Sequence, residues 1–144
     1  MSLRHPISSA LTAGSIYFGI VFAAGFVLGV LRVLILAPRL GETAAVLIEL
    51  PLILLVSWIV CGWLIRLFAV AAAAGPRLAM GGAAFLLLMA AELSLSVFVF
   101  GRPVSGHWRH YLTLAGALGL TGQIAFAAFP YLMLNGTLHA KPQR

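Results

Sequence analysis

The chain alternates long apolar stretches with short breaks that carry polar residues, glycine and proline. The apolar stretches cover residues 13–36, 43–68, 78–100 and 111–134. Each is long enough to cross a bilayer as a helix, because about 20 residues at about 1.5 Å rise span a hydrocarbon core of about 30 Å. The pattern predicts an all-α protein with a single domain, a transmembrane bundle of four antiparallel helices. Because the connections are short, consecutive helices are expected to be neighbours.

The breaks contain the residues that most often end helices. Proline cannot donate a helical hydrogen bond, and glycine reaches backbone conformations that other residues avoid. These residues are Pro38 and Gly41 in the first break, Gly75 and Pro76 in the second, and Gly101, Pro103 and Gly106 in the third. They fall where hydropathy falls, so two independent signals predict the same four helices.

Composition indicates that lipid is the main solvent of this chain. Hydrophobic residues make up 62% of the 144 residues and charged residues 8%, with a mean hydropathy of +1.10. A soluble domain carries about a quarter charged residues, so that class is excluded and the lipid bilayer is the expected partner. The net charge of +6 does not point to nucleic acid, because the basic residues lie scattered at the ends of apolar stretches. With Cys61 as its one cysteine, the chain forms no intramolecular disulfide.

The distribution of Arg and Lys predicts an orientation in the membrane. With four crossings, one side carries Arg4, Arg66, Arg77, Lys141 and Arg144, together with both termini. The opposite side carries Arg39, Arg102 and Arg109. Cytoplasmic segments hold an excess of basic residues, so both termini are expected in the cytoplasm. The preference for Arg over Lys, with many Ala and Gly, favours a GC-rich bacterial genome and hence a bacterial inner membrane. The residues typical of aromatic belts are Trp63 and Tyr131 at one boundary, and Trp108 and Tyr111 at the other.

Three ionisable residues lie inside the apolar stretches at a similar expected depth. Arg32 is near the end of the first helix, Glu49 near the start of the second, and Glu92 near the end of the third. At 1.5 Å per residue, all three lie roughly 7 to 12 Å below the same membrane boundary. Because an isolated charge at that depth is costly, they are predicted to form one buried cluster. The cluster either fixes the helix register or serves as a proton or cation site.

Small and polar residues on two helices support this convergence. The glycines at helix-packing spacing are Gly25, Gly29, Gly116 and Gly119. Gln123 continues the stripe of the fourth helix to mid-membrane, where its amide needs a hydrogen-bond partner. Ser96, one turn beyond Glu92, is expected to donate to that carboxylate.

Other chemistry has weaker support in the sequence. His107 and His110 stand three residues apart at the start of the fourth helix, but with no histidine in a helix interior, no metal or haem site is predicted. No catalytic constellation or phosphate-binding loop is present, so no cofactor and no enzymatic activity are expected. The arginines at 39, 102 and 109 would also suit a lipid phosphate, although basic residues at helix ends usually serve as anchors.

Two resemblances accompany these residues. The length and four-helix plan resemble the small multidrug-resistance transporters, in which an acid in the first helix carries protons and cationic drugs by turns. The first helix here has Arg32 and no acid, so no functional residue is carried over. The turn PRLGE, Pro38 to Glu42, and the following ELP, Glu49 to Pro51, resemble a family of short four-helix bacterial inner-membrane proteins, a likeness that implies no particular activity.

The function favoured by these patterns is a non-enzymatic membrane subunit with a structural or accessory role. It would act in a homo-oligomer or beside a larger membrane complex. The buried cluster of Arg32, Glu49 and Glu92 would hold the helices of the bundle together. The alternative is a small proton-coupled transporter or channel in which Glu49 or Glu92 takes up and releases a proton.

Overall fold

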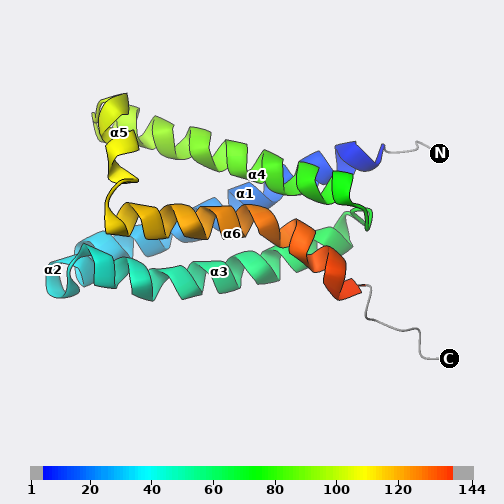
Figure 1. Ribbon diagram of the computed structural model, residues 1–144, viewed down its shortest axis with the longest axis horizontal. Coiled ribbons are helices and arrows are strands. Elements are labelled where there is room, and N and C mark those ends of the chain that lie inside the picture. The colour runs from blue at the N-terminus through cyan, green and yellow to red at the C-terminus, as the bar shows by residue number, and fades with distance from the viewer. Residues whose placement is uncertain (1–4, 138–144) are drawn as a thin grey trace.

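The computed structural model describes residues 5–137, and over that range the chain is helical with no β-strand (Figure 1). Its elements are α1 (Pro6–Leu31), η1 (Arg32–Leu36), α2 (Ala37–Leu40), α3 (Glu42–Leu67), α4 (Ala74–Ser94), η2 (Leu95–Val99), α5 (Val104–His110) and α6 (Leu114–Thr137). Four of the resulting helical spans are long and apolar enough to cross a membrane: Pro6–Leu40, Glu42–Leu67, Ala74–Val99 and Leu114–Asn135. The four long helices predicted from hydropathy are therefore present.

The first helix extends further than predicted at both ends. It begins at Pro6, a residue whose missing N–H is harmless in a first turn. It also continues past the predicted breaker Pro38, because η1 is a turn of π-helix, closed by the Ala37 N–H on the carbonyl of Arg32. A widened turn accommodates the proline ring, which would clash with the carbonyl four residues earlier in a regular α-helix. The turn itself comes at Gly41, with φ of 83°.

The later connections also differ in detail from the sequence prediction. Gly75 and Pro76 lie inside the first turn of α4, where proline is tolerated, and the chain turns earlier, at Ala69, with φ of 46°. The third connection turns at Gly101, with φ of 60°, and then forms the short α5. Tyr111, predicted to begin the fourth membrane helix, lies in the link between α5 and α6.

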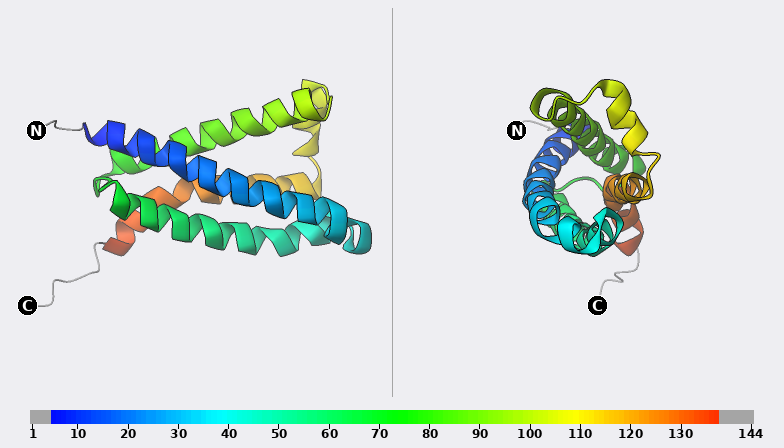
Figure 2. Two further views of the ribbon diagram at one scale, coloured as in Figure 1. Left: turned by 180° about the vertical axis from the view of Figure 1, so that it is seen from behind. Right: turned by 90° about the vertical axis from the view of Figure 1, so that its left-hand side faces the viewer.

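The four long helices form a ring (Figure 2). α1 packs against α3 and α4, and α6 packs against the same two helices. α3 and α4 do not form one of the packed helix pairs and lie across the ring from each other, so the expectation that all consecutive helices are neighbours is wrong at this connection. The first residues of α1 and the last residues of α6 lie at one end of the ring, and α2 and α5 lie at the other (Figure 1).

The hydrophobic core occupies the end of the ring where α1 begins and α6 ends. Its fully buried members include Tyr17, Leu64 and Met80. Glycines let the backbones approach closely there: a Cβ at Gly14 would lie 2.5 Å from the carbonyl oxygen of Met80, and one at Gly81 would collide with the carbonyl of Ala127. We call this half of the molecule the packed end.

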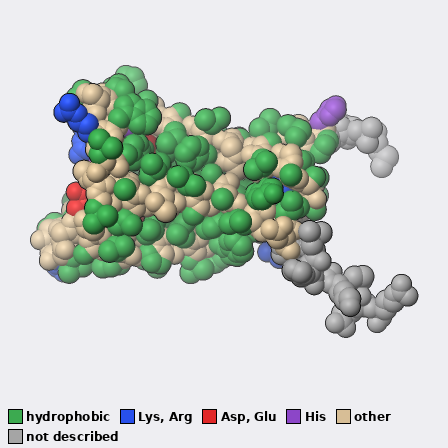
Figure 3. All heavy atoms as spheres, in the orientation of Figure 1, with side chains coloured by type: hydrophobic (Ala, Val, Ile, Leu, Met, Phe, Trp, Pro, Cys, Tyr) green, Lys and Arg blue, Asp and Glu red, His purple; other side chains and the backbone are tan. Residues whose placement is uncertain are grey.

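The outer surface of the ring is apolar. Large hydrophobic side chains are exposed along all four long helices, and Figure 3 shows them covering the face in view. Examples are Leu34 on η1, Ile59 on α3 and Leu86 on α4, each 60–70% exposed. Burial of apolar area in water stabilises a fold by about 25 cal/mol per Å², so a surface of this kind is typical of a protein solvated by lipid.

Candidate functional site

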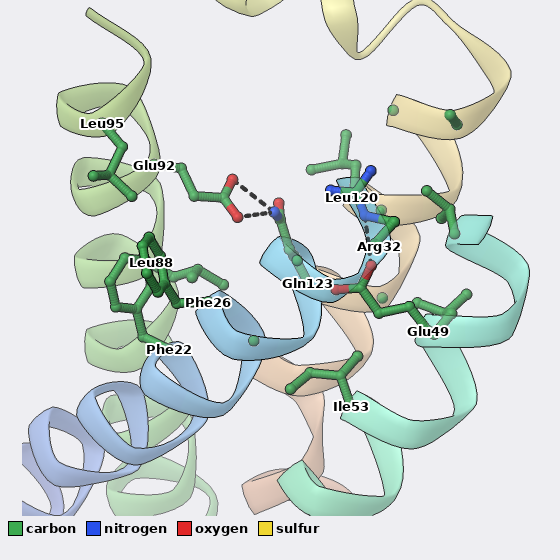
Figure 4. Close-up of a pocket in the computed structure, with 18 of the residues that line it drawn as sticks. Phe22, Phe26, Arg32, Glu49, Ile53, Leu88, Glu92, Leu95, Leu120 and Gln123 are labelled. Atoms are coloured by element: carbon green, nitrogen blue, oxygen red, sulfur yellow. Dashed lines mark hydrogen bonds and ion pairs between the residues drawn. The ribbon is translucent and has the colours of Figure 1, made fainter. Parts of the chain in front are cut away.

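A cavity of about 570 Å³ lies between the helices, on the side of the ring that holds α2 and α5 (Figure 4). All four long helices contribute to its wall, and so do the exposed Arg102 and the residues His107, His110 and Tyr111. Because Arg102 is exposed, the cavity reaches the surface of the molecule near α5. The ring is therefore closed by side chains at the packed end and hollow at the other.

Two of the four glycines predicted to pack helices together instead border open space in this cavity. Gly25, Gly29, Gly116 and Gly119 all line the cavity. A Cβ at Gly29 or Gly119 would meet no described atom within 4 Å, so neither glycine permits a close helix contact within the described chain. A Cβ at Gly25 would lie 3.6 Å from the side chain of Ile53 on α3, and one at Gly116 would collide with the carbonyl of His110, the last residue of α5. The glycine pattern therefore serves packing at two positions and leaves open cavity space at the other two.

Arg32 and Glu49 form an ion pair on one wall of the cavity. Arg32 is the first residue of η1, and its Nε lies 2.6 Å from Oε2 of Glu49 on α3. The N–H is not aligned as a hydrogen-bond donor to that oxygen, so the contact is mainly electrostatic. Both side chains are largely buried, at 25% and 17% exposed. The depth matching of these two residues in the sequence thus corresponds to a direct contact.

Glu92 belongs to a separate cluster on α4 and α6. The amide nitrogen of Gln123 donates to both of its carboxylate oxygens, at 2.6 and 2.7 Å. In Figure 4 Glu92 points toward Gln123, whereas Arg32 points toward Glu49. No Arg or Lys among residues 5–137 forms an ion pair with Glu92. The prediction of one cluster of three charges is therefore wrong in its connectivity, because depth along a helix does not fix the direction of a side chain around it.

Tyr111 is the second hydrogen-bond partner of Glu92 and was not predicted as a site residue. Its hydroxyl donates to Oε2 of Glu92 at 3.2 Å and lies 3.4 Å from Nε2 of His107. The phenol gives its one proton to Glu92, so the second contact is a hydrogen bond when Nε2 of His107 carries a proton. Burial, followed by the nearby negative charge of Glu92, raises the pKa of Tyr111 to about 12. The spacing of His107 and Tyr111, four residues apart beside a helix start, was the available signal.

The structure does not bear out the predicted role of Ser96. Ser96 is buried at the second position of η2, but it is not among the hydrogen-bond partners of Glu92 in the described chain. Its backbone carbonyl accepts from the N–H of Arg102 at 2.9 Å, which holds the turn after η2. The wider π-helical turn begins one residue before Ser96, so α-helical spacing from Glu92 no longer applies there.

One further oxygen in the cavity wall lacks a partner. The amide oxygen of Gln123 is buried and accepts no hydrogen bond within the described chain. An acceptor left without a donor away from water costs free energy, on the order of 1–3 kcal/mol. The cavity therefore presents a carboxylate and an unused acceptor side by side, and no Arg or Lys among residues 5–137 forms an ion pair with that carboxylate.

The packed end contains an arginine that the sequence analysis assigned to the membrane surface. Arg77 is 2% exposed, and its guanidinium donates to the carbonyls of Ala71, Val70 and Pro130 at 3.2 to 3.5 Å. These bonds tie the connection before α4 to α6. Arg77 therefore cannot be counted with the surface charges; Arg4, Lys141 and Arg144, also used for orientation, lie outside the described residues.

A second polar contact at the packed end follows from a proline. Pro130 inside α6 has no N–H to donate to the carbonyl of Phe126. The hydroxyl of the fully buried Tyr17 donates to that oxygen at 3.0 Å, and its ring stacks on Phe126 at 4.3 Å. Side chains of α1 and α4 thus complete backbone groups of α6, which locks three helices together at this end.

Metal-ligating residues do not gather in the described chain. Within residues 5–137 no group of three or more His, Cys, Asp or Glu side chains is placed to hold a metal ion. His107 and His110 both line the cavity, and His107 contacts Tyr111.

The site and the four long apolar helices define an all-helical protein with the features of a multi-pass membrane protein. The chain matches no protein-family model, and neither the curated proteins nor the solved structures contain a significant match to it. Function is therefore argued from the residues of the cavity.

Proposed function

We propose that this chain is an integral membrane protein that crosses the bilayer four times as a bundle of antiparallel helices. Four helices of sufficient length and an apolar outer surface support this placement. We further propose a bacterial inner membrane with both termini in the cytoplasm, on the basis of the Arg-rich composition and of the basic residues Arg4, Arg66, Lys141 and Arg144 that the sequence places on that side. The cavity would then open toward the opposite side, where α2 and α5 lie.

Within that frame we propose proton-coupled transport of a small solute through the cavity, with Glu92 as the group that exchanges protons. The observation that supports it is the position of Glu92: it lines the cavity and has no basic residue as an ion-pair partner in the described chain. A transport acid has to exist in both protonation states, and a fixed arginine would hold it ionised. Glu49, paired with Arg32, is better suited to a structural role.

His107 and Tyr111 give Glu92 a hydrogen-bonded connection toward the α5 end. The chain runs from Nε2 of His107 to the hydroxyl of Tyr111 and on to Oε2 of Glu92. His110 also acts on Glu92 electrostatically, and Gln123 contacts it from α6. Because one ring nitrogen of His107 lies at the hydroxyl of Tyr111, this chain would give a proton a route to Glu92 that avoids lipid.

A structural or accessory subunit is the second candidate, and the Arg32–Glu49 pair favours it. A buried ion pair can fix helix register, and removing one partner alone is destabilising because the other charge stays buried without compensation. In that case the chain would act in a homo-oligomer or a larger membrane complex. Under either proposal we propose no enzymatic activity.

The test is flux into liposomes that contain the purified protein, with a pH gradient and a pH-sensitive dye inside. We expect proton flux in the wild type, loss of at least tenfold in Glu92→Gln, and little change in the matched variant Glu49→Gln. The exposed Glu42, in the first turn of α3, gives the control Glu42→Gln. Wild-type liposomes that pass no more protons than empty ones, at verified insertion, would reject transport and leave the accessory role.

A further inference from the structure

The geometry of the cavity points to a specific ligand class: we propose that it binds a protonated primary or secondary amine attached to an apolar body. This inference rests on the proposed transport function and names its solute. Three features of the wall carry it: a carboxylate with no paired cation, an unused acceptor beside it, and apolar side chains around both.

The carboxylate of Glu92 has room for a positively charged ligand. A carboxylate offers about four lone-pair sites, and Gln123 and Tyr111 occupy three of them through N–H and O–H donors. These donors are neutral, and no Arg or Lys among residues 5–137 pairs with Glu92, so the ionised carboxylate lacks a fixed counter-ion; the imidazoles of His107 and His110 lie on the α5 side of the same cavity. On the other wall, Arg32 already has Glu49 as its counter-ion. A cationic ligand is therefore favoured beside Glu92, and an anionic one is opposed there.

The amide oxygen of Gln123 favours the binding of amines that carry N–H donors over the binding of other cations. It belongs to the same side chain whose nitrogen holds Glu92, it is buried, and it accepts no bond within the described chain. An ammonium group with two or three N–H donors can bond the carboxylate and this oxygen together. A quaternary ammonium has the same charge and no N–H, so it leaves the oxygen without a donor at the cost already described.

The rest of the wall indicates an apolar body on the ligand. Phe22 and Phe26 come from α1, Ile53 from α3, and Leu88 and Leu95 from α4 and η2 (Figure 4). A volume of about 570 Å³ is within the range of small-molecule pockets, which are lined mostly by apolar side chains with a few polar groups for orientation. A bare metal ion or a small hydrated cation would use the carboxylate and leave this apolar wall without a partner.

The experiment measures binding of three probes of equal chain length to the protein in lipid nanodiscs: octylammonium, octyltrimethylammonium and octanol. Isothermal titration calorimetry is corrected with empty nanodiscs. We expect octylammonium to bind at least about tenfold more tightly than octyltrimethylammonium, because only octylammonium has N–H groups for the carboxylate and the amide oxygen, and octanol to bind most weakly. Equal affinity for the two cations would overturn the proposal.

Substitutions in the cavity test which residues produce the preference for octylammonium. Gln123→Met keeps the side-chain length and removes one of the two acceptors, so the advantage of octylammonium over octyltrimethylammonium should shrink, whereas Glu92→Gln should weaken both cations and leave octanol unchanged. Glu42→Gln is the matched control and should behave as the wild type. If either site variant fails to fold, as judged by gel filtration, the ranking of the three probes on the wild type still decides. Binding with this ranking but without flux would reject transport alone, and flux without this ranking would reject the amine.

Discussion

Filling the cavity from its glycine wall should block transport without weakening the fold. Gly29 on α1 and Gly119 on α6 both line the cavity, and a Cβ at either position meets no described atom within 4 Å. The perturbation is the double substitution Gly29→Leu with Gly119→Leu. Its matched control is Gly19→Leu with Gly82→Leu, at glycines that also have open space around them but do not line the cavity.

The size of the effect follows from the volume. Each leucine adds four carbon atoms, and at roughly 30 Å³ each, the share of one water in the liquid, two leucines occupy about 240 Å³. That is about two fifths of the cavity of about 570 Å³. Glycine is also the weakest helix former apart from proline, so each replacement should stabilise its helix by up to about 0.8 kcal/mol. The double variant is therefore expected to be at least as stable as the wild type.

The assay is solute and proton flux in liposomes, together with thermal unfolding in detergent. We expect flux in the Gly29/Gly119 double variant to fall at least tenfold, while the Gly19/Gly82 control keeps its flux and both variants keep their Tm. Wild-type flux in a folded cavity-filled variant would show that solute does not pass through the cavity. A large drop in Tm confined to the cavity-filled variant would show that the space around these two glycines is not open.

Three further predictions follow from contacts outside the glycine wall. Gly14→Ala forces a Cβ against a carbonyl of α4 at 2.5 Å, so it should lower the free energy of unfolding in detergent by about 1–3 kcal/mol; an unchanged value would contradict the close approach. Tyr111 should titrate near pH 12 by tyrosine NMR, and Glu92→Gln should move its pKa back toward the ordinary value of about 10 by removing a nearby anion. Because the folded form holds this proton more tightly, the stability it provides is present below pH 10 and is lost as pH rises from about 10 to 12. Arg32→Met alone should cost roughly 1–3 kcal/mol by leaving Glu49 without its partner, and adding Glu49→Leu should recover part of that loss in the same unfolding assay; equal losses would argue against a coupled pair.

Hydropathy was sufficient to predict the number and kind of the helices, because length and apolar composition are local properties of the chain. The similar expected depth of Arg32 and Glu49 in the membrane was sufficient to predict their contact, because the two residues lie on either side of one turn. The same argument from depth failed for Glu92, because its partner depends on how α4 is rotated about its own axis and on the order of the helices around the ring. That order places α4 beside α6. Neither the rotation of α4 nor the order of the helices can be predicted from the spacing of residues along one helix.

The remaining errors have a similar physical origin. A row of glycines along a helix indicates only that side chains are absent. Their absence allows close packing at Gly14 and leaves an open cavity at Gly29. An arginine near a helix start usually anchors in headgroups, whereas Arg77 finds three backbone carbonyls inside the packed end. In both cases the outcome depends on the neighbouring helix, which a single sequence does not specify.

The contrast between the packed end and the hollow end has a mechanical consequence. With three helices locked together by Tyr17, Arg77 and the tight glycine contacts, the packed end acts as a pivot for any spreading of the ring. The first helical span has 35 residues, about 50 Å at 1.5 Å per residue. Tilting such a rod by about 5° around one end moves the other by roughly 4 Å, about the width of a methylene chain. With the packed end held fixed, a small tilt of α1 and its continuation into α2 would therefore widen or narrow the hollow end of the ring.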